Sequence, residues 1–481
     1  MDLNHDACYS AIQVRDARYD GRFFTAVKTT RIYCRPVCPA RTPLSKNVTF
    51  YATAAAAQEA GYHPCLRCRP ETAPELGPGH ELPDSVSRAL QLIELGALDE
   101  DGVDSLAQRL GVGERQLRRQ FRQHLGASPV AVAQTRRVLL AKQLIHESRL
   151  PMAEIAFASG FGSIRRFNEI FHDLFGRAPG ELRRSAKPEV SAQQEGEIKL
   201  LLRYRPPYDW NAMLDFLRLR AIPGIEQVTD DTYARTICLD GHQGTVTVRP
   251  GAGDALQAIV RFPRLQALPA IIARLRRVFD LASDPVAIAA QFSSDPVLTS
   301  LIQARPGLRV PGAWDGFELA MRAVLGQQIT VAAAIRLAGK LVAAHGAPMA
   351  QPDGGLTHVF PLAEAVAGAE LASLGMPRSR AAALSAVAAA AVADKHLFDA
   401  GSGLAESVLR LRAIRGIGEW TAQYIALRQL REPDAFPSAD IGLIRALERL
   451  ESREYTPAQL LARAEAWRPW RAYAAQHLWA A

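Results

Sequence analysis

The sequence predicts a multidomain protein that is mainly helical, with smaller parts that mix helices and strands. Its 481 residues are enough for about three domains of ordinary size. Two stretches are typical of linkers: Thr72–Pro83 is rich in proline and glycine, and Ser185–Glu197 is polar without apolar periodicity. The region after the second linker begins with strand-like runs such as Tyr233–Leu239 and Gly244–Arg249, and then becomes rich in alanine and leucine, which favours helices. The expected domains are 1–75, 84–184, 198–282 and 283–481.

The composition excludes several classes of protein. Hydrophobic residues make up 48% and charged residues 22%, a balance that fits neither wholesale disorder nor a collagen-like fibre. No run of about 18 apolar residues occurs, and the first six residues hold no apolar stretch, so neither a membrane span nor a secretory signal is expected. We therefore expect a cytoplasmic protein, associated with the nucleoid if it binds DNA. The net charge of +8 permits a polyanionic partner without demanding one.

Four of the six cysteines form two closely spaced pairs, Cys34-x3-Cys38 and Cys65-x2-Cys68. Each pair can hold one side of a tetrahedral ion, and Zn²⁺ suits four thiolates. We expect one zinc ion with these four ligands; the alternative occupant is an iron–sulfur cluster. On spacing alone, a closed site of four cysteines is more often structural than reactive.

The residues around the cysteines carry a more specific signal. The stretches Val27–Arg41, Asn47–Ala52 and Gly61–Pro70 make residues 5–72 similar to the metal-binding domain of the Ada family of DNA-repair regulators. The resemblance implies a small α/β zinc domain whose first cysteine, Cys34, accepts a methyl group from a methylphosphotriester in DNA. The other three cysteines would complete the zinc site.

This chemistry is consistent with a zinc–thiolate centre. Zinc keeps sulfur deprotonated at neutral pH, and the thiolate is the nucleophile. Four thiolates on one Zn²⁺ give a formal charge of −2, and transfer of CH₃⁺ leaves −1, so methylation removes one negative charge facing the DNA backbone. Nearby arginines are candidates for phosphate contacts, although solvated loop charges are the alternative. These arginines are Arg31, Arg35, Arg41, Arg67 and Arg69.

The middle region contains an internal repeat. Leu106–Pro129 and Ile155–Pro179 match in their glycines, phenylalanines and prolines, and each predicts a helix, a glycine turn and a second helix. With the ending Phe175–Gly180, residues 84–184 resemble the double helix-turn-helix domain of AraC-type regulators, which implies an all-α domain with recognition helices near 114–124 and 163–173. The alternative is a helical bundle with solvated arginines. The side chains expected to reach DNA are Arg115, Arg118, Arg119, Arg122, Arg165, Arg166 and Asn168.

Leu411–Tyr424 predicts two helices joined by a tight turn that contains Gly416 and Gly418. Backbone N–H groups at such a turn can hold a phosphate without sequence preference. Taken alone, the pattern is equally compatible with an ordinary turn. The later Asp440, taken alone, is more often a helix cap than a catalytic group.

The sequence around this region favours a catalytic role for Asp440. Segments such as Arg205–Trp210, Ala304–Gly312, Ala323–Gln328 and Trp467–Ala474 make residues 200–481 similar to AlkA-type 3-methyladenine DNA glycosylases of the helix-hairpin-helix superfamily. The resemblance implies an α+β part followed by an all-α helix-hairpin-helix part, with Asp440 as the catalytic carboxylate. Such a carboxylate stabilises the oxocarbenium-like sugar and orients or deprotonates water.

The resemblance also implies an aromatic pocket that would favour a cationic base through cation–π contact. Its expected members, for which core packing is the alternative, are Phe216, Trp420, Tyr424 and Trp479. Two positions depart from the pattern. Ala439 stands where a second acidic residue is expected, and Gln328 stands where an apolar wedge would enter the duplex.

The sequence thus predicts a bifunctional alkylation-damage protein. Methylation of Cys34 would make its first half an activator of alkylation-response genes, and its second half would excise bases such as 3-methyladenine. The implied partners are double-stranded DNA and RNA polymerase, with a monomeric chain. The rival hypothesis is a transcription regulator whose glycosylase-like part is an inactive DNA-binding module; the hairpin and Asp440 argue against it.

Overall fold

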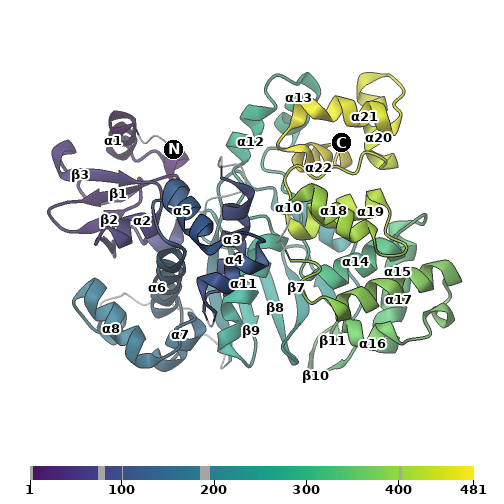
Figure 1. Cartoon of the computed structure of the whole chain (residues 1–481), viewed down its shortest axis with the longest axis horizontal. Coiled ribbons are helices and arrows are strands. Elements are labelled where there is room, and N and C mark those ends of the chain that lie inside the picture. The colour runs from purple at the N-terminus through teal and green to yellow at the C-terminus, as the bar shows by residue number, and fades with distance from the viewer. Residues whose placement is uncertain (1–3, 74–81, 100, 185–195, 400–402) are drawn as a thin grey trace. The chain divides into compact units, whose positions relative to one another are not determined.

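The computed structural model describes residues 4–73, 82–99, 101–184, 196–399 and 403–481 (Figure 1). The chain forms two compact units, one of Met1–Arg203 with Arg264–Ala273 and one of Tyr204–Pro263 with Arg274–Ala481. Both are mainly helical with smaller sheets, so the predicted fold class is confirmed. Most of both predicted linkers, residues 74–81 and 185–195, lies outside the described residues.

The first part of the first unit is a small α/β domain around one sheet with the strand order β3-β1-β2-β4. Strands β2 and β4 run parallel, with Tyr33 opposite Pro64. Because Cys34 and Cys65 follow directly, this register sets the two cysteine pairs side by side. The elements are α1 (His5–Val14), β1 (Phe24–Val27), β2 (Ile32–Cys34), β3 (Val48–Tyr51), α2 (Ala54–Glu59), β4 (His63–Pro64) and the 3₁₀ turns Ala17–Tyr19, Ser45–Asn47 and Pro70–Thr72.

The rest of the first unit is helical and follows the internal repeat. Each copy is a short helix, a turn opened by a glycine with positive φ (Gly111 or Gly160), and a second helix. The second helix of the first copy buries Leu117, Phe121 and Leu125, which recur every four residues on one face. The elements are α3 (Asp84–Glu94), α4 (Val103–Arg109), α5 (Glu114–Leu125), α6 (Pro129–Glu147), α7 (Met152–Ala158), α8 (Ile164–Phe175), α9 (Pro179–Arg184) and β5 (Ile198–Arg203).

The second unit opens with a helix and an antiparallel meander. Both strand-like runs of the sequence are strands, paired with Tyr233 opposite Val248 and Leu239 opposite His242. The last strand of the meander alternates buried and partly exposed positions, as expected for a sheet with one covered face. The elements are α10 (Trp210–Arg218), β6 (Glu226–Val228), β7 (Tyr233–Leu239), β8 (His242–Pro250) and β9 (Ala255–Arg261).

The remainder of the second unit is a cluster of helices around a large apolar core. The expectation of helices alone was incomplete, because Pro348–Asp353 and Leu356–His358 pair as a short hairpin around Gly354 and Gly355. The helices are α11 (Leu268–Val278, which begins in the first unit), α12 (Pro285–Gln291), α13 (Pro296–Ala304), α14 (Gly316–Leu325), α15 (Val331–His345), α16 (Ala363–Ala367), α17 (Arg378–Ala393), α18 (Leu404–Arg412), α19 (Glu419–Ile425), α20 (Ile441–Glu451), α21 (Pro457–Ala464) and α22 (Arg471–Trp479).

The residues that the structure describes include no helix with the length and apolarity that a membrane crossing requires.

Candidate functional site

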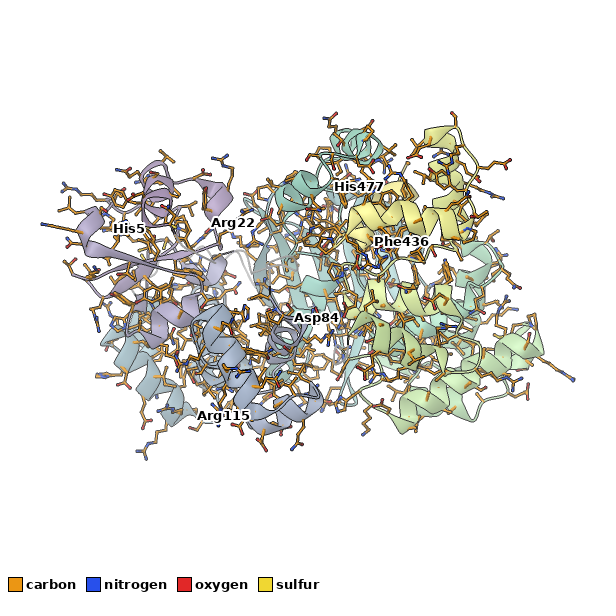
Figure 2. All side chains as sticks on the ribbon, turned by 45° about the horizontal axis from the view of Figure 1, so that its top comes forward. His5, Arg22, Asp84, Arg115, Phe436 and His477 are labelled. Atoms are coloured by element: carbon orange, nitrogen blue, oxygen red, sulfur yellow. The ribbon has the colours of Figure 1, made fainter. Side chains whose placement is uncertain are left out.

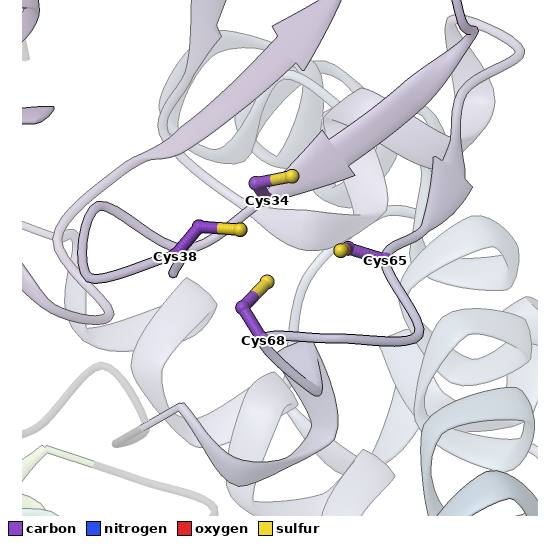
Figure 3. A group of neighbouring side chains, drawn as sticks. All are labelled: Cys34, Cys38, Cys65 and Cys68. Carbon is purple, nitrogen blue, oxygen red and sulfur yellow. The ribbon is translucent and has the colours of Figure 1, made fainter. Parts of the chain in front are cut away.

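The four cysteines meet at one point, with their sulfur atoms turned toward one another (Figure 3). All four Sγ atoms lie within 4.8 Å of one another. Tetrahedral zinc with Zn–S bonds of about 2.3 Å needs sulfur atoms about 3.8 Å apart, so only a small contraction is required. The donor set and geometry therefore fit one Zn²⁺ held by Cys34, Cys38, Cys65 and Cys68.

The four sulfur atoms differ in exposure and in hydrogen bonding. Cys34, Cys38 and Cys65 line a cleft of about 900 Å³ within the first unit, whereas Cys68 does not. The backbone N–H of Arg67 donates to Cys65 Sγ at 3.4 Å, and that of Arg35 donates to Cys68 Sγ at 3.3 Å. The backbone of Ala40 forms a hydrogen bond with Cys38. No backbone N–H of the described residues donates to Cys34 Sγ. Each such bond withdraws electron density from its sulfur, and Cys34 lines the cleft without one among the described residues.

Two of the five candidate arginines are held in internal ion pairs. Arg35 pairs with the buried Asp20, and its Nη1 donates to the Cys68 carbonyl oxygen at 3.2 Å. Arg69 pairs with Glu71 at 3.1 Å. These two guanidinium groups stabilise the loops that carry the cysteines. The exposed arginines nearby are Arg31, Arg41 and Arg67, and their phosphate contacts stay a prediction.

Removing zinc is expected to unfold the small domain selectively. Its apolar clusters are small, so the ion supplies a large part of the folding free energy of the domain; structural zinc contributes about 10–16 kcal/mol in comparable small sites. After chelation, hydrogen exchange should accelerate across residues 4–73. All six tryptophans lie between Trp210 and Trp479, so the tryptophan-monitored unfolding of the second unit should not change. Unchanged exchange in residues 4–73 would contradict a structural role for the ion.

The two second helices of the repeat present most of the predicted DNA-contacting arginines to solvent. Figure 2 shows Arg115 on the outside of α5. Arg118 forms an i,i+4 pair with Glu114 at 2.6 Å, and Arg122 reaches Glu59 of α2 at 2.5 Å. Arg122 thus joins the recognition helix to the zinc domain. The exposed positions are Arg115, Arg118, Arg119, Arg122, Arg165, Arg166 and Asn168.

A second site lies within the second unit, in a cleft of about 650 Å³. Asp440 stands at its wall as the N-cap of α20, with Oδ1 accepting from the Leu443 N–H at 3.0 Å. Its carboxylate also accepts the indole N–H of Trp420 at 2.8 Å and that of Trp479 at 3.0 Å. The prediction from the sequence that a lone aspartate here would be a helix cap is therefore right, and this cap also lines the cleft.

The four predicted aromatic residues meet in the same cleft, none of them fully buried in the core. The rings of Trp420 and Tyr424 stack, with centroids 5.2 Å apart and planes 8° from parallel. Trp479 stands edge-on to Tyr424 at 6.4 Å. Phe216 enters from α10. Their arrangement leaves a slot with aromatic walls, and the Asp440 carboxylate is hydrogen-bonded to two of these aromatic residues.

Sequence reasoning missed the arginines that also line this cleft, which are Arg220, Arg235, Arg305, Arg322 and Arg428. The guanidinium carbon of Arg220 lies 3.9 Å from the Phe216 ring centroid. Arg428 is buried and lies against the rings of Phe216, Tyr424 and Trp479. A signal was available, because Trp420, Tyr424 and Arg428 recur every four residues and so share one helical face. The pocket is therefore not purely aromatic.

The predicted hairpin joins α18 to α19 and leaves its glycines exposed. Gln327 links this turn to the loop after α14, since its Nε2 donates to the Gly416 carbonyl at 3.0 Å and to Thr421 Oγ1 at 3.1 Å. The neighbouring Gln328 is exposed and has a positive φ of 59°. The predicted wedge residue thus projects from a loop fixed to the hairpin, beside the cleft.

The hairpin glycines allow a matched test. Gly416 has φ of +90°, and a Cβ there would lie 2.2 Å from the Ala383 Cβ, so Gly416→Ala should destabilise the second unit by about 3 kcal/mol. Gly418 has φ of −87°, and an added methyl group would meet nothing within 4 Å, so Gly418→Ala should change stability little. Denaturant unfolding followed by tryptophan fluorescence measures both. Equal stability of the two variants would contradict the assigned turn geometry.

Both sites have counterparts in known protein families. The chain matches the models for the metal binding domain of Ada over residues 7–71 and a helix-turn-helix domain over 106–185. It matches the AlkA N-terminal domain over 199–315 and the HhH-GPD superfamily of base excision DNA repair proteins over 321–472. These matches define the class: an Ada-type zinc sensor and a helix-turn-helix domain joined to a helix-hairpin-helix glycosylase.

Similar proteins extend this family assignment to the whole chain. A probable bifunctional transcriptional activator/DNA repair enzyme AlkA of Mycobacterium tuberculosis is 41% identical over 485 aligned positions, covering 100% of this chain and 97% of that protein. DNA-3-methyladenine glycosylase 2 of Escherichia coli is 35% identical over 58% of this chain and 95% of its own. A 3-methyladenine DNA glycosylase from Archaeoglobus fulgidus shares the fold, with 23% identity, coverage of 58% and 96%, and a TM-score of 0.51. The chain belongs to the family of AlkA-type bifunctional transcriptional activator and DNA repair enzymes.

Proposed function

We propose that the chain repairs and reports DNA alkylation through two separate sites. The first unit is an Ada-type methylphosphotriester sensor with a zinc–thiolate centre, and the second unit is an alkyl-base glycosylase. DNA is the substrate of both and the target of the helix-turn-helix domain. The proposed domains are 1–75, 84–184, 198–282 and 283–481. Separate family matches support the first two divisions, whereas the AlkA N-terminal match runs to residue 315, past the proposed boundary at 282.

In the sensor, Cys34 is the methyl acceptor. Zinc, when bound, keeps the four thiols deprotonated at neutral pH. Cys34 Sγ attacks the methyl carbon of the phosphotriester; the carbon–oxygen bond breaks, and its electron pair leaves with the phosphodiester oxygen. The position of Cys34 on the cleft wall and its lack of backbone N–H donors among the described residues support this assignment. Arg31 and Arg41 are the proposed phosphate contacts near the cleft, whereas Arg35 positions the cysteine loops through Asp20.

In the glycosylase, Asp440 stabilises positive charge on the sugar while the bond to the damaged base breaks. The two indole N–H groups hold its carboxylate at one edge of the slot, so the charge is oriented before substrate arrives. Trp420, Tyr424, Trp479 and Phe216 bind the base after it is flipped from the duplex. Gln328 fills the gap that the base leaves in the duplex, and the hairpin at Gly416 and Gly418 binds the phosphate backbone of the DNA.

The observation that carries the glycosylase assignment is the joint hydrogen bonding of Asp440 by both tryptophans in the cleft. The test is release of free base from DNA methylated with dimethyl sulfate, measured by chromatography. Release by the wild-type chain supports the proposal. No release would favour the rival hypothesis, a transcription regulator with an inactive glycosylase-like module.

Two further features belong to the proposal. As a transcription activator, the methylated sensor contacts RNA polymerase at promoters of alkylation-response genes. The chain acts as a monomer on the nucleoid in the cytoplasm. Light scattering of the purified chain, alone and with promoter DNA, tests the oligomeric state.

A further inference from the structure

Arg428 occupies an unusual position in the cleft of the second unit. Helix α19 continues into a single π-helical turn, Ala426–Leu430, which carries Arg428 at its centre. Such turns are rare and are enriched at functional sites. The Arg428 side chain is only 3% exposed, yet it lines the cleft that also contains Asp440.

The guanidinium group of Arg428 is in contact with three of the four pocket rings. Its central carbon lies 4.5 Å from the Phe216 ring centroid, 5.3 Å from that of Tyr424 and 5.2 Å from that of Trp479. A protein cation therefore already occupies the cation–π positions that the sequence assigned to a cationic base. Attraction between a cationic base and these rings is correspondingly reduced.

Arg428 is anchored but incompletely paired. Its Nη1 donates to the Pro311 carbonyl at 2.9 Å and to Gln476 Oε1 at 3.3 Å. Its Nε is buried and has no hydrogen-bond partner in the described part of the chain. A buried donor without a partner is costly, so the position of Arg428 is not explained by its own hydrogen bonds alone. Burial lowers the pKa of Arg428 to about 10, so the group remains a cation at neutral pH.

Trp479 contacts both Asp440 and Arg428. Its indole N–H donates to Asp440 Oδ1 at 3.0 Å, and the face of its ring contacts the Arg428 guanidinium. The carboxylate and the cation are thereby held at different parts of one pocket. A nucleoside in this pocket would place its sugar toward one charge and its base toward the other.

We propose that Arg428 is the electrostatic partner of the departing base and decides how the enzyme handles cationic and neutral lesions. This inference rests on the proposed glycosylase function and assigns a specificity role within it. The ligand class is a flipped purine base, whose charge before and after cleavage interacts with the Arg428 guanidinium in the cleft.

The change of charge during the reaction explains why Arg428 would favour cleavage of both kinds of lesion. When the bond between C1′ and the base nitrogen breaks, its electron pair stays on the base and the sugar becomes cationic. A cationic alkylpurine leaves neutral, whereas a neutral base leaves as an anion and later takes a proton from water. Water adds to C1′ and loses a proton. The base always gains one negative charge, so its interaction with Arg428 always improves during cleavage.

Binding, in contrast, depends on the lesion. Before cleavage, Arg428 repels a cationic base and does not repel a neutral one. Arg428 therefore weakens binding of cationic lesions while it accelerates cleavage of both kinds. That combination separates a charge effect from simple loss of packing.

The test uses the full-length chain and single-turnover kinetics on duplexes that contain either 7-methylguanine, a cationic base, or hypoxanthine, a neutral one. In Arg428→Met, the maximal rate should fall about tenfold or more for both lesions. The half-saturating enzyme concentration for 7-methylguanine should fall relative to that for hypoxanthine, by about tenfold. Arg428→Lys, which keeps the charge, should restore most of the rate and the wild-type binding ratio.

Arg431 provides the matched control. It lies at the end of the same turn and donates to the Val310 carbonyl at 2.8 Å, next to the Pro311 anchor of Arg428, but it does not line the cleft. Arg431→Met should lower the melting temperature without changing the binding ratio of the two lesions. An unchanged ratio in Arg428→Met, or a lysine variant no better than methionine, overturns the inference. If wild type releases neither base, the proposed glycosylase function has failed instead.

Discussion

Asp440→Asn is expected to reduce the rate of base excision by about two to three orders of magnitude. The amide removes the negative charge that faces the sugar, and loss of one preorganised electrostatic contact typically has an effect of this size. The fold should persist, because asparagine caps helices as well as aspartate and can still accept from the Leu443 N–H. Single-turnover release of 7-methylguanine at saturating enzyme measures the change.

The chain offers a matched control for this variant. Asp295 also caps a helix, with Oδ1 accepting from the Leu298 N–H, and also accepts an indole N–H, from Trp467 at 2.7 Å. It does not line the cleft. Asp295→Asn should lower stability while excision at 25 °C persists. Excision that survives in Asp440→Asn at the wild-type rate would remove Asp440 from the mechanism.

Cys34→Ala is expected to abolish methyl uptake from DNA methylphosphotriesters. Mass spectrometry of the protein after incubation with methylated DNA should show one added methyl group in wild type and none in the variant. Wild-type methylation should also raise promoter affinity by one to two orders of magnitude, because one negative charge about 6–8 Å from a phosphate is worth roughly 2–3 kcal/mol at an effective dielectric near 20. That gain should be absent in Cys34→Ala.

Two measurements keep this result interpretable. Cys238→Ala alters a cysteine on β7 of the second unit and should leave uptake unchanged. Base excision by Cys34→Ala should also remain, since the cleft with Asp440 lies in the other unit. A peptide map that places the methyl group on Cys38 or Cys65, both of which line the same cleft, would refute the assignment of Cys34.

The sequence determined the parts that depend on short spacing. Two cysteine pairs, a repeated helix–turn–helix pattern and a glycine turn between helices are local, because backbone geometry fixes which neighbouring residues share a turn or a face. The zinc quartet, the helical repeat and the strand Tyr233–Leu239 therefore appear where they were expected. The short hairpin near Gly354 was missed, since a strand that begins with proline carries little local signal.

Only the tertiary structure decided which arginines are free of internal ion pairs and which of them line a pocket. Arg35 and Arg69 resemble Arg31 and Arg41 in sequence, but the first two are paired with Asp20 and Glu71. Likewise, the spacing places Arg428 on the helical face of Tyr424, but only the packing brings it against three rings drawn from α10, α19 and α22. Ion pairs and pocket walls form between residues far apart in the chain, and their partners are fixed by packing rather than by spacing.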